Sequence, residues 1–324
     1  MIKALALFSG GLDSILAVRL IEEQGIDMRG ICFESPFFSA QKARQSARYI
    51  GIPLTVMDIT ERMLPIVLNP RHGYGKGMNP CIDCHALMFR VAGEMLKEEG
   101  ARFMISGEVL GQRPMSQNLR SLSIISRESG FDGLILRPLS AKRLPETLAE
   151  SQGWVNRERL LELSGRSRKP QIELAKGYGV EQYPSPAGGC LLTDVVFSRR
   201  LKDLITKNPG FSRPDLELLK QGRHFRISEG TKIVVGRNKR ENEAIISLTR
   251  REDTLLTVEL FPGPTALVIG DSPLEELEVA AAITVSYSDA PLHQPVNVVM
   301  KRDSTRKTFR ARRVEKSAFH RFMI

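Results

Sequence analysis

The loop SGGLDS, near the start of the chain, combines residue types that bind phosphate. Gly10 and Gly11 lack a Cβ, so backbone N–H groups can approach an anion closely, and a following helix N-terminus adds its positive dipole end. The hydroxyls of Ser9 and Ser14 can donate to phosphate oxygens. Phosphate alone would repel Asp13, so its carboxylate suits a Mg²⁺ ion lying between them. The pattern predicts a site for a phosphorylated ligand with Mg²⁺.

The same loop has a second interpretation, a glycine turn whose Asp and Ser support the first turn of a helix. It also lacks the Gly-Lys-Ser/Thr ending of a Walker loop. That difference disfavours ordinary γ-phosphate hydrolysis.

Two of the four cysteines, Cys81 and Cys84, form a CxxC pair in NPCIDCHALMF. Four cysteines in 324 residues are too few for a disulfide scaffold, so a metal or catalytic element is favoured. Cys190, in the Gly-rich stretch SPAGGCLLTD, is a third candidate for the same metal or catalytic element. We expect Cys32 to be a buried apolar residue instead. Zinc is less favoured because a closed site needs a fourth ligand, and His85 follows Cys84 directly.

The first two hundred residues alternate short apolar runs with helical patterns, which predicts strands followed by helices. The CxxC lies just before one of these helices, the stretch ALMFRVAGEMLKEEG. Such alternation is typical of an α/β fold, a doubly wound parallel sheet covered on both faces. Ligands bind at the carboxyl ends of the strands in such sheets, where the SGG, ESP and SGE turns fall. The predicted strands are residues 2–8, 29–35, 53–59 and 102–106.

From residue 224 the pattern of apolar and polar residues changes and indicates short strands with two intervening helices, which predicts a smaller α+β domain. Two helical stretches, around SRRLKDLIT and RPDLELLKQ, precede it. We therefore expect three parts: a pyrophosphate-loop domain at 1–195, a helical linker at 196–226 and the α+β domain at 227–324.

The formal charge of the chain is +10 and its pI is near 9.6. Residues 301–324 contain nine Lys or Arg against one Asp and one Glu. Such a stripe favours a polyanion partner, because cations that neutralise phosphates release counterions. A merely solvated tail is the alternative. The candidate contacts here are Arg310, Arg312 and Arg313.

Composition excludes several other classes. The chain is 42% hydrophobic and 26% charged, as in an ordinary folded protein rather than a disordered one. Its opening apolar run is too short to span a membrane and has no signal-cleavage pattern. We expect a cytoplasmic protein without a membrane anchor.

Three motifs together resemble known families. SGGLDS resembles the pyrophosphate loop of the adenylating ATP pyrophosphatases, with their adenine nucleotide alpha hydrolase-like fold. The stretch 105–118, ISGEVLGQRPMSQN, resembles the SGE-x-LGQ-x-SQ segment of the tRNA 4-thiouridine synthetases, with one residue more before Gln117. The resemblance implies that Gly107 and Gln117 contact ATP, that Phe33 flanks the adenine, and that the loop residues bind the phosphates.

The stretch 230–248, GTKIVVGRNKRENEAIISL, resembles the VGRN-type core of the NFACT RNA-binding domain. This implies RNA contacts for Arg237, Lys239 and Arg240, and Asn238 would also cap the following helix. In this sequence no RNA-capturing domain precedes the SGGLDS loop, so we expect the C-terminal unit to hold tRNA.

The resemblance to the thiouridine synthetases implies a reaction. ATP adenylates a carbonyl oxygen of a uridine base, and a sulfur nucleophile from hydrosulfide or a sulfur-carrier protein then displaces AMP. Enzymes of this group use either a catalytic persulfide with a transient disulfide or a [4Fe-4S] cluster held by three cysteines. Here the cluster ligands would be Cys81, Cys84 and Cys190, with Asp13, Cys81 and Cys190 as the catalytic residues. The disulfide route stays as the alternative.

Two other functions remain open from the residues. A pyrophosphate-loop enzyme could instead perform an amidation or ligase step, with nitrogen as the nucleophile. An RNA-binding protein could use an ATP site only to regulate binding. The three cysteines favour thiolation over both, because neither alternative needs them.

Overall fold

The computed structural model describes residues 2–184 and 189–324. The chain divides into two compact units between Asp194 and Val195. Four residues of the Gly-rich stretch before Cys190, 185–188, lie outside the described residues.

The first unit contains a five-stranded sheet in the order β3-β2-β1-β4-β5, with every neighbouring pair parallel. The apolar runs form these strands because a parallel sheet is buried on both faces. The fold class inferred from the alternating pattern is therefore confirmed. The strands are β1 (Lys3–Leu7), β2 (Asp27–Glu34), β3 (Leu54–Asp58), β4 (Phe103–Ser106) and β5 (Ile135–Leu136).

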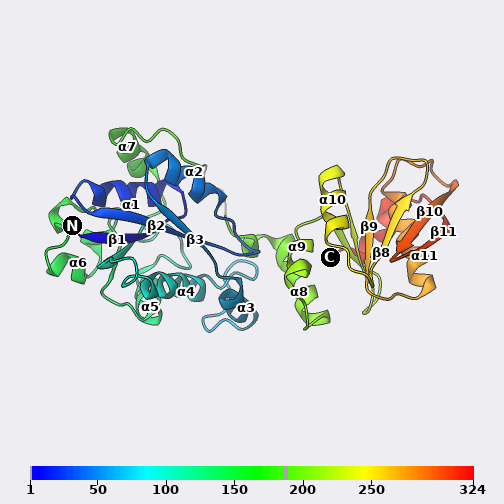
Figure 1. The fold of residues 1–324 in the computed structure, drawn as a ribbon, viewed down its shortest axis with the longest axis horizontal. Helices are drawn as coiled ribbons and strands as arrows, with labels where there is room; N and C mark the ends of the chain where they lie inside the picture. Colours follow the sequence, from blue (N-terminus) through cyan, green and yellow to red (C-terminus); the bar gives the residue numbers. More distant parts are fainter. Residues whose placement is uncertain (1, 185–188) are drawn as a thin grey trace. The chain divides into compact units, whose positions relative to one another are not determined.

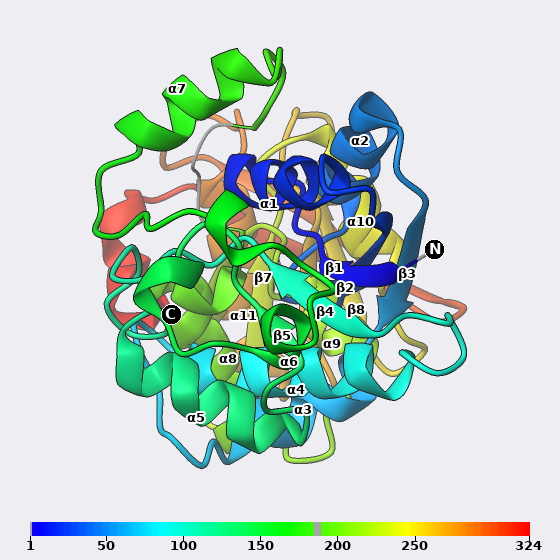
Figure 2. The ribbon, with the colours of Figure 1, turned by 90° about the vertical axis from the view of Figure 1, so that its left-hand side faces the viewer.

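Helices cover both faces of this sheet (Figure 2). One face carries α1, α2 and α7, and their apolar sides join the strands in one large core. The other face carries α3, α4 and α5, with α4 packed along α5. The helices are α1 (Leu12–Glu22), α2 (Gln41–Ile50), α3 (Thr60–Leu68), α4 (Cys81–Glu94), α5 (Leu119–Ser129) and α7 (Lys169–Gly177).

The strand order places a topological switch between β1 and β4. The chain builds outward from β1 through β2 to β3, then returns to add β4 on the other side of β1. A crevice outside the carboxyl ends of the strands forms at such a point. In the register Leu7 lies beside Ser106, so the SGGLDS loop and the SGE turn leave the sheet side by side.

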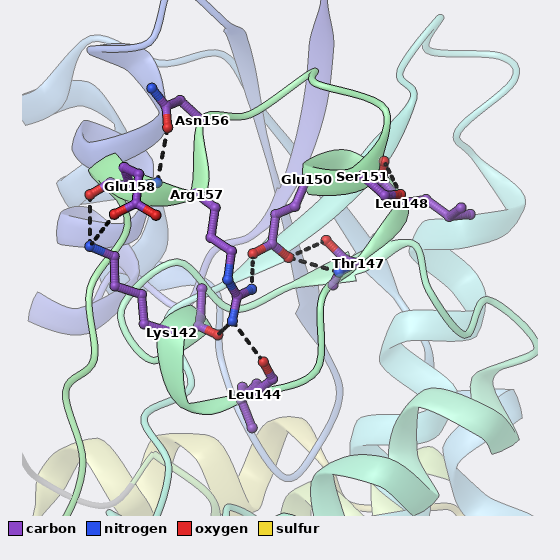
Figure 3. Close-up of polar contacts among 10 residues, drawn as sticks. Lys142, Leu144, Thr147, Leu148, Glu150, Ser151, Asn156, Arg157 and Glu158 are labelled. Carbon is purple, nitrogen blue, oxygen red and sulfur yellow. Dashed lines mark hydrogen bonds and ion pairs between the residues drawn. The ribbon is translucent and has the colours of Figure 1, made fainter.

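The segment after β5 is held together by one partly buried ion pair (Figure 3). Arg157 contacts the carboxylate of Glu150 and also donates to the carbonyls of Ala141 and Leu144. Glu150 in turn accepts from the backbone and hydroxyl of Thr147 in a capping box. Short elements follow one another here: η1 (Ala141–Arg143), α6 (Leu148–Ser151) and η2 (Arg157–Arg159).

The second unit contains a six-stranded antiparallel sheet in the order β11-β10-β8-β9-β7-β6. Figure 1 labels β8, β9, β10 and β11 of this sheet. All six strands overlap stretches in which the sequence predicted strands. They are β6 (Arg223–Arg226), β7 (Lys232–Val235), β8 (Thr254–Val258), β9 (Ala266–Ile269), β10 (Pro295–Arg302) and β11 (Thr305–Arg312). Their alternating pattern allows one face to pack on a core and the other to carry polar residues.

Different helices pack on the two faces of this sheet. On one face α11 (Leu274–Ser286) buries Ala280, Ile283 and neighbouring residues against the strands. On the other face α10 (Lys239–Ser247) packs Ile245 against the β7 and β9 side of the sheet. Asn238 accepts a hydrogen bond from the N–H of Glu241, so the predicted cap of this helix is confirmed.

Residues 196–226, expected to form a linker, make many contacts with the second unit. Asp203 of α8 (Val195–Lys207) forms ion pairs with Arg226 of β6 and Lys232 of β7. Asp215 of α9 (Arg213–Leu218) pairs with Arg250. The carboxylates draw these helices onto a unit whose nearby side chains are basic, and β6 itself belongs to the second sheet.

Two further short helical turns complete the chain. One, η3 (Leu191–Thr193), follows Cys190, and the other, η4 (Lys316–Phe322), lies near the C-terminus. Within the described residues, no helix combines the length and the apolar character that crossing a membrane requires.

Candidate active site

The phosphate loop lies between β1 and α1, as the sequence predicted. Gly10 has φ 74°, and a Cβ there would lie 2.6 Å from the carbonyl carbon of Lys42, so only glycine fits. Gly11 is the N-cap of α1 and has no side-chain cap, which leaves N–H groups of the first turn open to an anion. Ser14 donates to the Gly11 carbonyl at 2.8 Å, and its Oγ lies 3.4 Å from that of Ser9.

Asp13 contacts Gln112, for which the motifs indicated no role in the site. The Nε2 of Gln112 donates to Asp13 Oδ2 at 3.0 Å. The remaining oxygens of this pair, Asp13 Oδ1 and Gln112 Oε1, are buried and have no hydrogen-bond partner among the described residues. Orphaned acceptor oxygens on two side chains that contact each other fit a cation, because a buried carboxylate oxygen is costly unless it is paired or bound to metal.

Gly107 fixes the distance between the SGE turn and the phosphate loop. A Cβ at this position would lie 2.4 Å from the carbonyl carbon of Asp13 and 2.5 Å from the nitrogen of Ser14. These are backbone atoms at the start of α1, so they cannot yield. The turn after β4 therefore contacts the helix N-terminus that would hold phosphate.

Glu108 joins this turn to the CxxC helix. Its Oε1 lies 2.8 Å from Nδ1 of His85, and its Oε2 accepts from Nε of Arg137 at 2.8 Å. Burial alone would raise the pKa of Glu108, but the charge of Arg137 and the contacts with His85 lower it to about 2. The carboxylate is thus ionised and holds α4, β4 and the segment after β5 together. A His directly after the CxxC and a Glu in the SGE turn were the visible signals for this network.

The CxxC lies in the first turn of α4, whereas the sequence placed it just before that helix. Pro80 takes the N-cap position and provides no side-chain cap, whereas Asp83 in the first turn is favourable at the positive end of the helix dipole. Cys81 is half-buried and Cys84 is buried, and their spacing puts them on one side of the helix. Because α4 leads into β4, its first turn lies at the carboxyl edge of the sheet.

Backbone hydrogen bonds bring the Cys190 segment to the same edge. The N–H of Leu191 donates to the carbonyl of Phe37, in the turn after β2, at 2.9 Å. The N–H of Met78, just before the CxxC, donates to the carbonyl of Leu192 at 3.0 Å. Cys190 therefore comes near the first two cysteines although it is more than a hundred residues away in the sequence.

The three thiols influence one another electrostatically. Burial raises the pKa of Cys84 well above its usual value, and negative charge on Cys190 and Cys81 would raise it further. The pKa of Cys190 is raised to about 11 for similar reasons. Three clustered thiols without a cation stay protonated, and metal binding would displace their protons. The donor set is thus suited to a thiolate-bound metal centre.

One other group of possible metal ligands lies nearby. His72, Asp83 and Glu128 place ligand atoms within 4.8 Å of one another, and among the described residues the three cysteines do not form such a compact group. Asp83, however, accepts from the backbone N–H groups of Arg71 and His72, and Arg71 lies 3.4 Å from Glu128. These carboxylates already have donors, so this group positions the loop before α4.

The other predicted ATP contacts lie at the same edge of the first unit. Phe33 is near the end of β2 and is 5% exposed. Gln117 is buried, its carbonyl accepts from the N–H of Gly111, and its Oε1 has no partner among the described residues. A buried amide oxygen without a partner among the described residues is consistent with a ligand contact at Gln117.

Some of the residues predicted to contact RNA in the second unit are bound to other residues of the protein, and others are exposed. Arg237 forms a bidentate ion pair with Glu241, which also holds its backbone, whereas Lys239 and Arg240 are exposed. Arg313 donates to the carbonyl of Ala290 at 2.8 Å. Arg310 and Arg312, which the sequence grouped with it, are exposed and have no ion pair in the part of the chain that the structure describes. Arg237 and Arg313 thus have structural contacts that the sequence did not reveal.

Comparison with known proteins agrees with this two-part organisation. Residues 2–144 match the family model of the thiamine biosynthesis protein ThiI, and residues 222–323 match the NFACT protein RNA binding domain. The chain is 27% identical over 159 residues to a probable tRNA sulfurtransferase of Oceanobacillus iheyensis. It is 30% identical over 159 residues to one of Staphylococcus aureus.

These alignments cover 46% of this chain and 38% and 37% of the two relatives, so the chain spans less than two fifths of their length. Among solved structures, a 4-thiouridine synthetase in complex with RNA and bound ATP is 22% identical, with a TM-score of 0.32. That match covers 55% of this chain and 51% of the other. The resemblances inferred from the motifs are confirmed: the chain joins a ThiI-type domain in residues 2–144 to an NFACT-type RNA-binding domain in residues 222–323.

Proposed function

We propose that the protein is an ATP-dependent tRNA sulfurtransferase that replaces a carbonyl oxygen of a uridine base with sulfur. One observation carries the proposal: two adjacent residues connect the phosphate loop to the cysteines. Gly107 contacts the backbone of Asp13 and Ser14, and Glu108 binds His85, the residue after Cys84. The groups suited to adenylation and those suited to sulfur transfer are therefore held by one turn.

The first step would adenylate the uridine. The base oxygen attacks the α-phosphorus of ATP, and pyrophosphate leaves. Open N–H groups at the start of α1 and the hydroxyls of Ser9 and Ser14 would stabilise the charge that develops on the departing phosphates. Asp13, whose Oδ1 lacks a partner among the described residues, would hold Mg²⁺ with help from Gln112.

The second step would transfer sulfur. A sulfur nucleophile attacks the activated ring carbon, the C–O bond breaks, and AMP leaves with the former base oxygen. Cys81, Cys84 and Cys190 would hold a [4Fe-4S] cluster, which would supply a binding site for the hydrosulfide nucleophile. Burial of Cys84, and its connection through His85 to the SGE turn, would keep these thiols oriented toward the nucleotide site.

The second unit would hold the tRNA, as its match to an RNA-binding domain suggests. Sulfur would come from hydrosulfide or from a carrier protein. We place the reaction in the cytoplasm. The amidating enzyme and the regulated RNA-binding protein have no comparable use for three clustered cysteines.

Mass spectrometry of tRNA nucleosides from a strain lacking the gene tests the assignment. We expect one thiouridine to disappear and its unmodified uridine to appear at the same tRNA position. Complementation with the wild-type gene should restore it, and an Asp13→Ala gene should not. A nucleoside profile unchanged by the deletion would reject the thiolation proposal.

Metal analysis separates the cluster from the persulfide route. Protein prepared without oxygen should be brown and contain about four irons per chain, the content of a [4Fe-4S] cluster. Cys190→Ser should lose iron and thiolation but keep its fold, whereas Cys32→Ser should keep all three. Active, iron-free protein that forms a Cys84 to Cys190 bridge during turnover would establish the persulfide route instead.

A further inference from the structure

The β10–β11 hairpin has two different faces, which its antiparallel register separates. Residues directly opposite in such a pair point to the same side, and successive residues alternate. Val298 pairs with Phe309 and Met300 with Lys307, and these residues lie on the side of α11. The intervening residues of both strands must therefore point to the opposite side.

That opposite side is basic. Asn297 pairs with Arg310, Lys301 with Arg306, and Pro295 with Arg312. All six of these residues are exposed. We call the four cations, with the neighbouring exposed Thr308, the cationic face; it comprises Lys301, Arg306, Thr308, Arg310 and Arg312.

The cations of this face are largely free to meet a partner. Within the described residues, Lys301, Arg310 and Arg312 have no ion pair, and Arg306 lies 4.0 Å from Glu259. By contrast, Arg302 on the other side pairs with Asp271 at 2.5 Å, and Arg251 pairs with Asp303. Because a strand rises about 3.4 Å per residue, Arg310 and Arg312 lie about 7 Å apart along β11. A row of unpaired cations at a regular spacing suits a phosphate backbone.

The face offers no aromatic platform. Among the described residues of β10 and β11 the one aromatic side chain is Phe309, and it lies on the α11 side. Proteins that hold single-stranded RNA stack its bases on aromatic rings, whereas double-stranded RNA is bound through phosphates and 2′-hydroxyls. Thr308 and Asn297 can donate to the latter groups.

We propose that the cationic face of the β10–β11 hairpin binds the phosphate backbone of double-helical RNA, such as a tRNA stem. This inference rests on the RNA-binding role proposed for the second unit. It narrows that role to Lys301, Arg306, Arg310 and Arg312, and it assigns Arg313 and Arg237 to positioning the chain.

The other side of the hairpin supplies a matched control. Three cations there, Arg251, Arg302 and Lys307, line a separate groove of about 590 Å³ next to α11. Replacing these three by Gln removes the same charge as replacing Arg306, Arg310 and Arg312 by Gln. Both sets are in the same unit, so a difference between the variants reports position rather than net charge.

The test measures binding of the full chain to a blunt RNA duplex and to a single strand of equal length, across a salt series. For the duplex, we expect the Arg306, Arg310, Arg312 variant to bind at least about tenfold more weakly. We expect its log K to fall less steeply with log salt, by about one for each phosphate that is no longer neutralised. The groove variant should stay within about threefold of wild type, and wild type should prefer the duplex.

An equal or larger loss of affinity in the groove variant would overturn the proposal and move RNA to the groove. Preference for the single strand would also overturn it. Thermal unfolding followed by circular dichroism should match wild type in both variants, which controls for folding of the mutated second unit. If wild type binds duplex through this face yet forms no thiouridine, the proposed enzymatic function fails while this inference stands.

Discussion

The two sheets of the protein present their functional residues in different ways. The parallel sheet of the first unit is covered on both faces, so its candidate site lies at the carboxyl edge, where loops from β1, β2 and β4 meet. The antiparallel sheet of the second unit leaves part of one face exposed, and the cationic face of the β10–β11 hairpin lies there. Chemistry needs convergent loops, whereas a long polyanion needs an extended surface.

The contrast also appears in how charges are compensated. In the first unit Glu108 is buried between His85 and Arg137, and both partners are side chains from other elements. In the second unit Arg310 and Arg312 project from an exposed strand without ion-pair partners in the described chain. Experiments on each unit test this contrast, and the largest effect on stability is expected for fragments cut near the boundary between the units.

The boundary between the units can be tested with two fragments. Residues 195–324 should fold, with one cooperative unfolding transition followed by circular dichroism. Residues 227–324 lack β6 and the fully buried Phe225, and they leave Lys232 without Asp203. Loss of a buried Phe and of a buried partner each cost about 3 to 5 kcal/mol, so this fragment should not fold. Equal stability of the two fragments would mean that residues 196–226 are a linker, as the sequence predicted, and not part of the second unit.

The folded fragment should also bind RNA with an affinity that falls steeply as salt rises. A gel shift at low and high salt measures this. Binding that is insensitive to salt would contradict the electrostatic account of the second unit.

Replacing Asp13 by Ala should abolish adenylation while RNA affinity stays unchanged. The carboxylate is the group suited to Mg²⁺ beside the phosphates, and loss of one such electrostatic interaction costs about 10² to 10³ in rate. AMP release with tRNA present measures the first effect and a gel shift the second. Asp27→Ala, an exposed change at the start of β2, is the control. Wild-type AMP release from Asp13→Ala would contradict the assigned role.

Replacing Glu108 by Gln should lower the free energy of unfolding by about 3 to 5 kcal/mol, because it leaves the buried Arg137 without its partner. Glu94→Gln is the matched control, since Glu94 pairs with Arg62 at the surface, where ion pairs are worth about 0 to 1 kcal/mol. Urea unfolding of both variants at pH 7 measures the difference. Equal stabilities would mean that the Glu108 network does not hold the site together.

The pH dependence of the same variant has a defined sign. The folded pKa of Glu108 is about 2, below the ordinary value of 4.5, because Arg137 and His85 outweigh the effect of burial. The carboxylate therefore stabilises the fold above pH 4.5, and this contribution disappears as pH falls toward 2. The stability gap between wild type and Glu108→Gln should narrow over that range. A gap independent of pH would contradict it.

The smallest expected effect on RNA affinity concerns Arg157, which belongs to a basic stretch of the first unit. Its guanidinium faces inward to Glu150 and two carbonyls (Figure 3), so it is not available to phosphate. Arg157→Gln should reduce stability yet change RNA affinity by less than about twofold, in contrast to the cationic face. A large loss of RNA affinity in the folded variant would extend the RNA surface to the first unit.

Sequence alone revealed much of this arrangement, because some features are local. The SGGLDS loop, the alternating strands and the Asn238 cap depend on neighbours a few residues away. The contacts from Gln112 to Asp13 and from His85 to Glu108 join segments that are distant in the sequence, and no local sequence pattern predicts them. The sequence showed that these four residues are polar, but which of them pair depends on β1 and β4 being neighbours in the sheet.

The second unit shows the same limit. Alternation in TFRARRV indicates an exposed strand, yet Arg313 lies beyond its end and turns to the Ala290 carbonyl. Helices α8 and α9 resemble a linker in sequence, because amphipathic patterns show that a helix packs but not against which unit. Asp203 and Asp215 provide that information only through their partners.

The central claim is that one turn couples adenylation to sulfur transfer, and a reconstituted reaction tests it most directly. Wild-type protein prepared without oxygen is incubated with unmodified tRNA, Mg²⁺-ATP and hydrosulfide, and AMP and tRNA nucleosides are quantified by mass spectrometry. We expect one AMP released for each thiouridine formed, with neither product from Asp13→Ala. AMP release with no change in the tRNA, or thiouridine formed without AMP release, would contradict the claim.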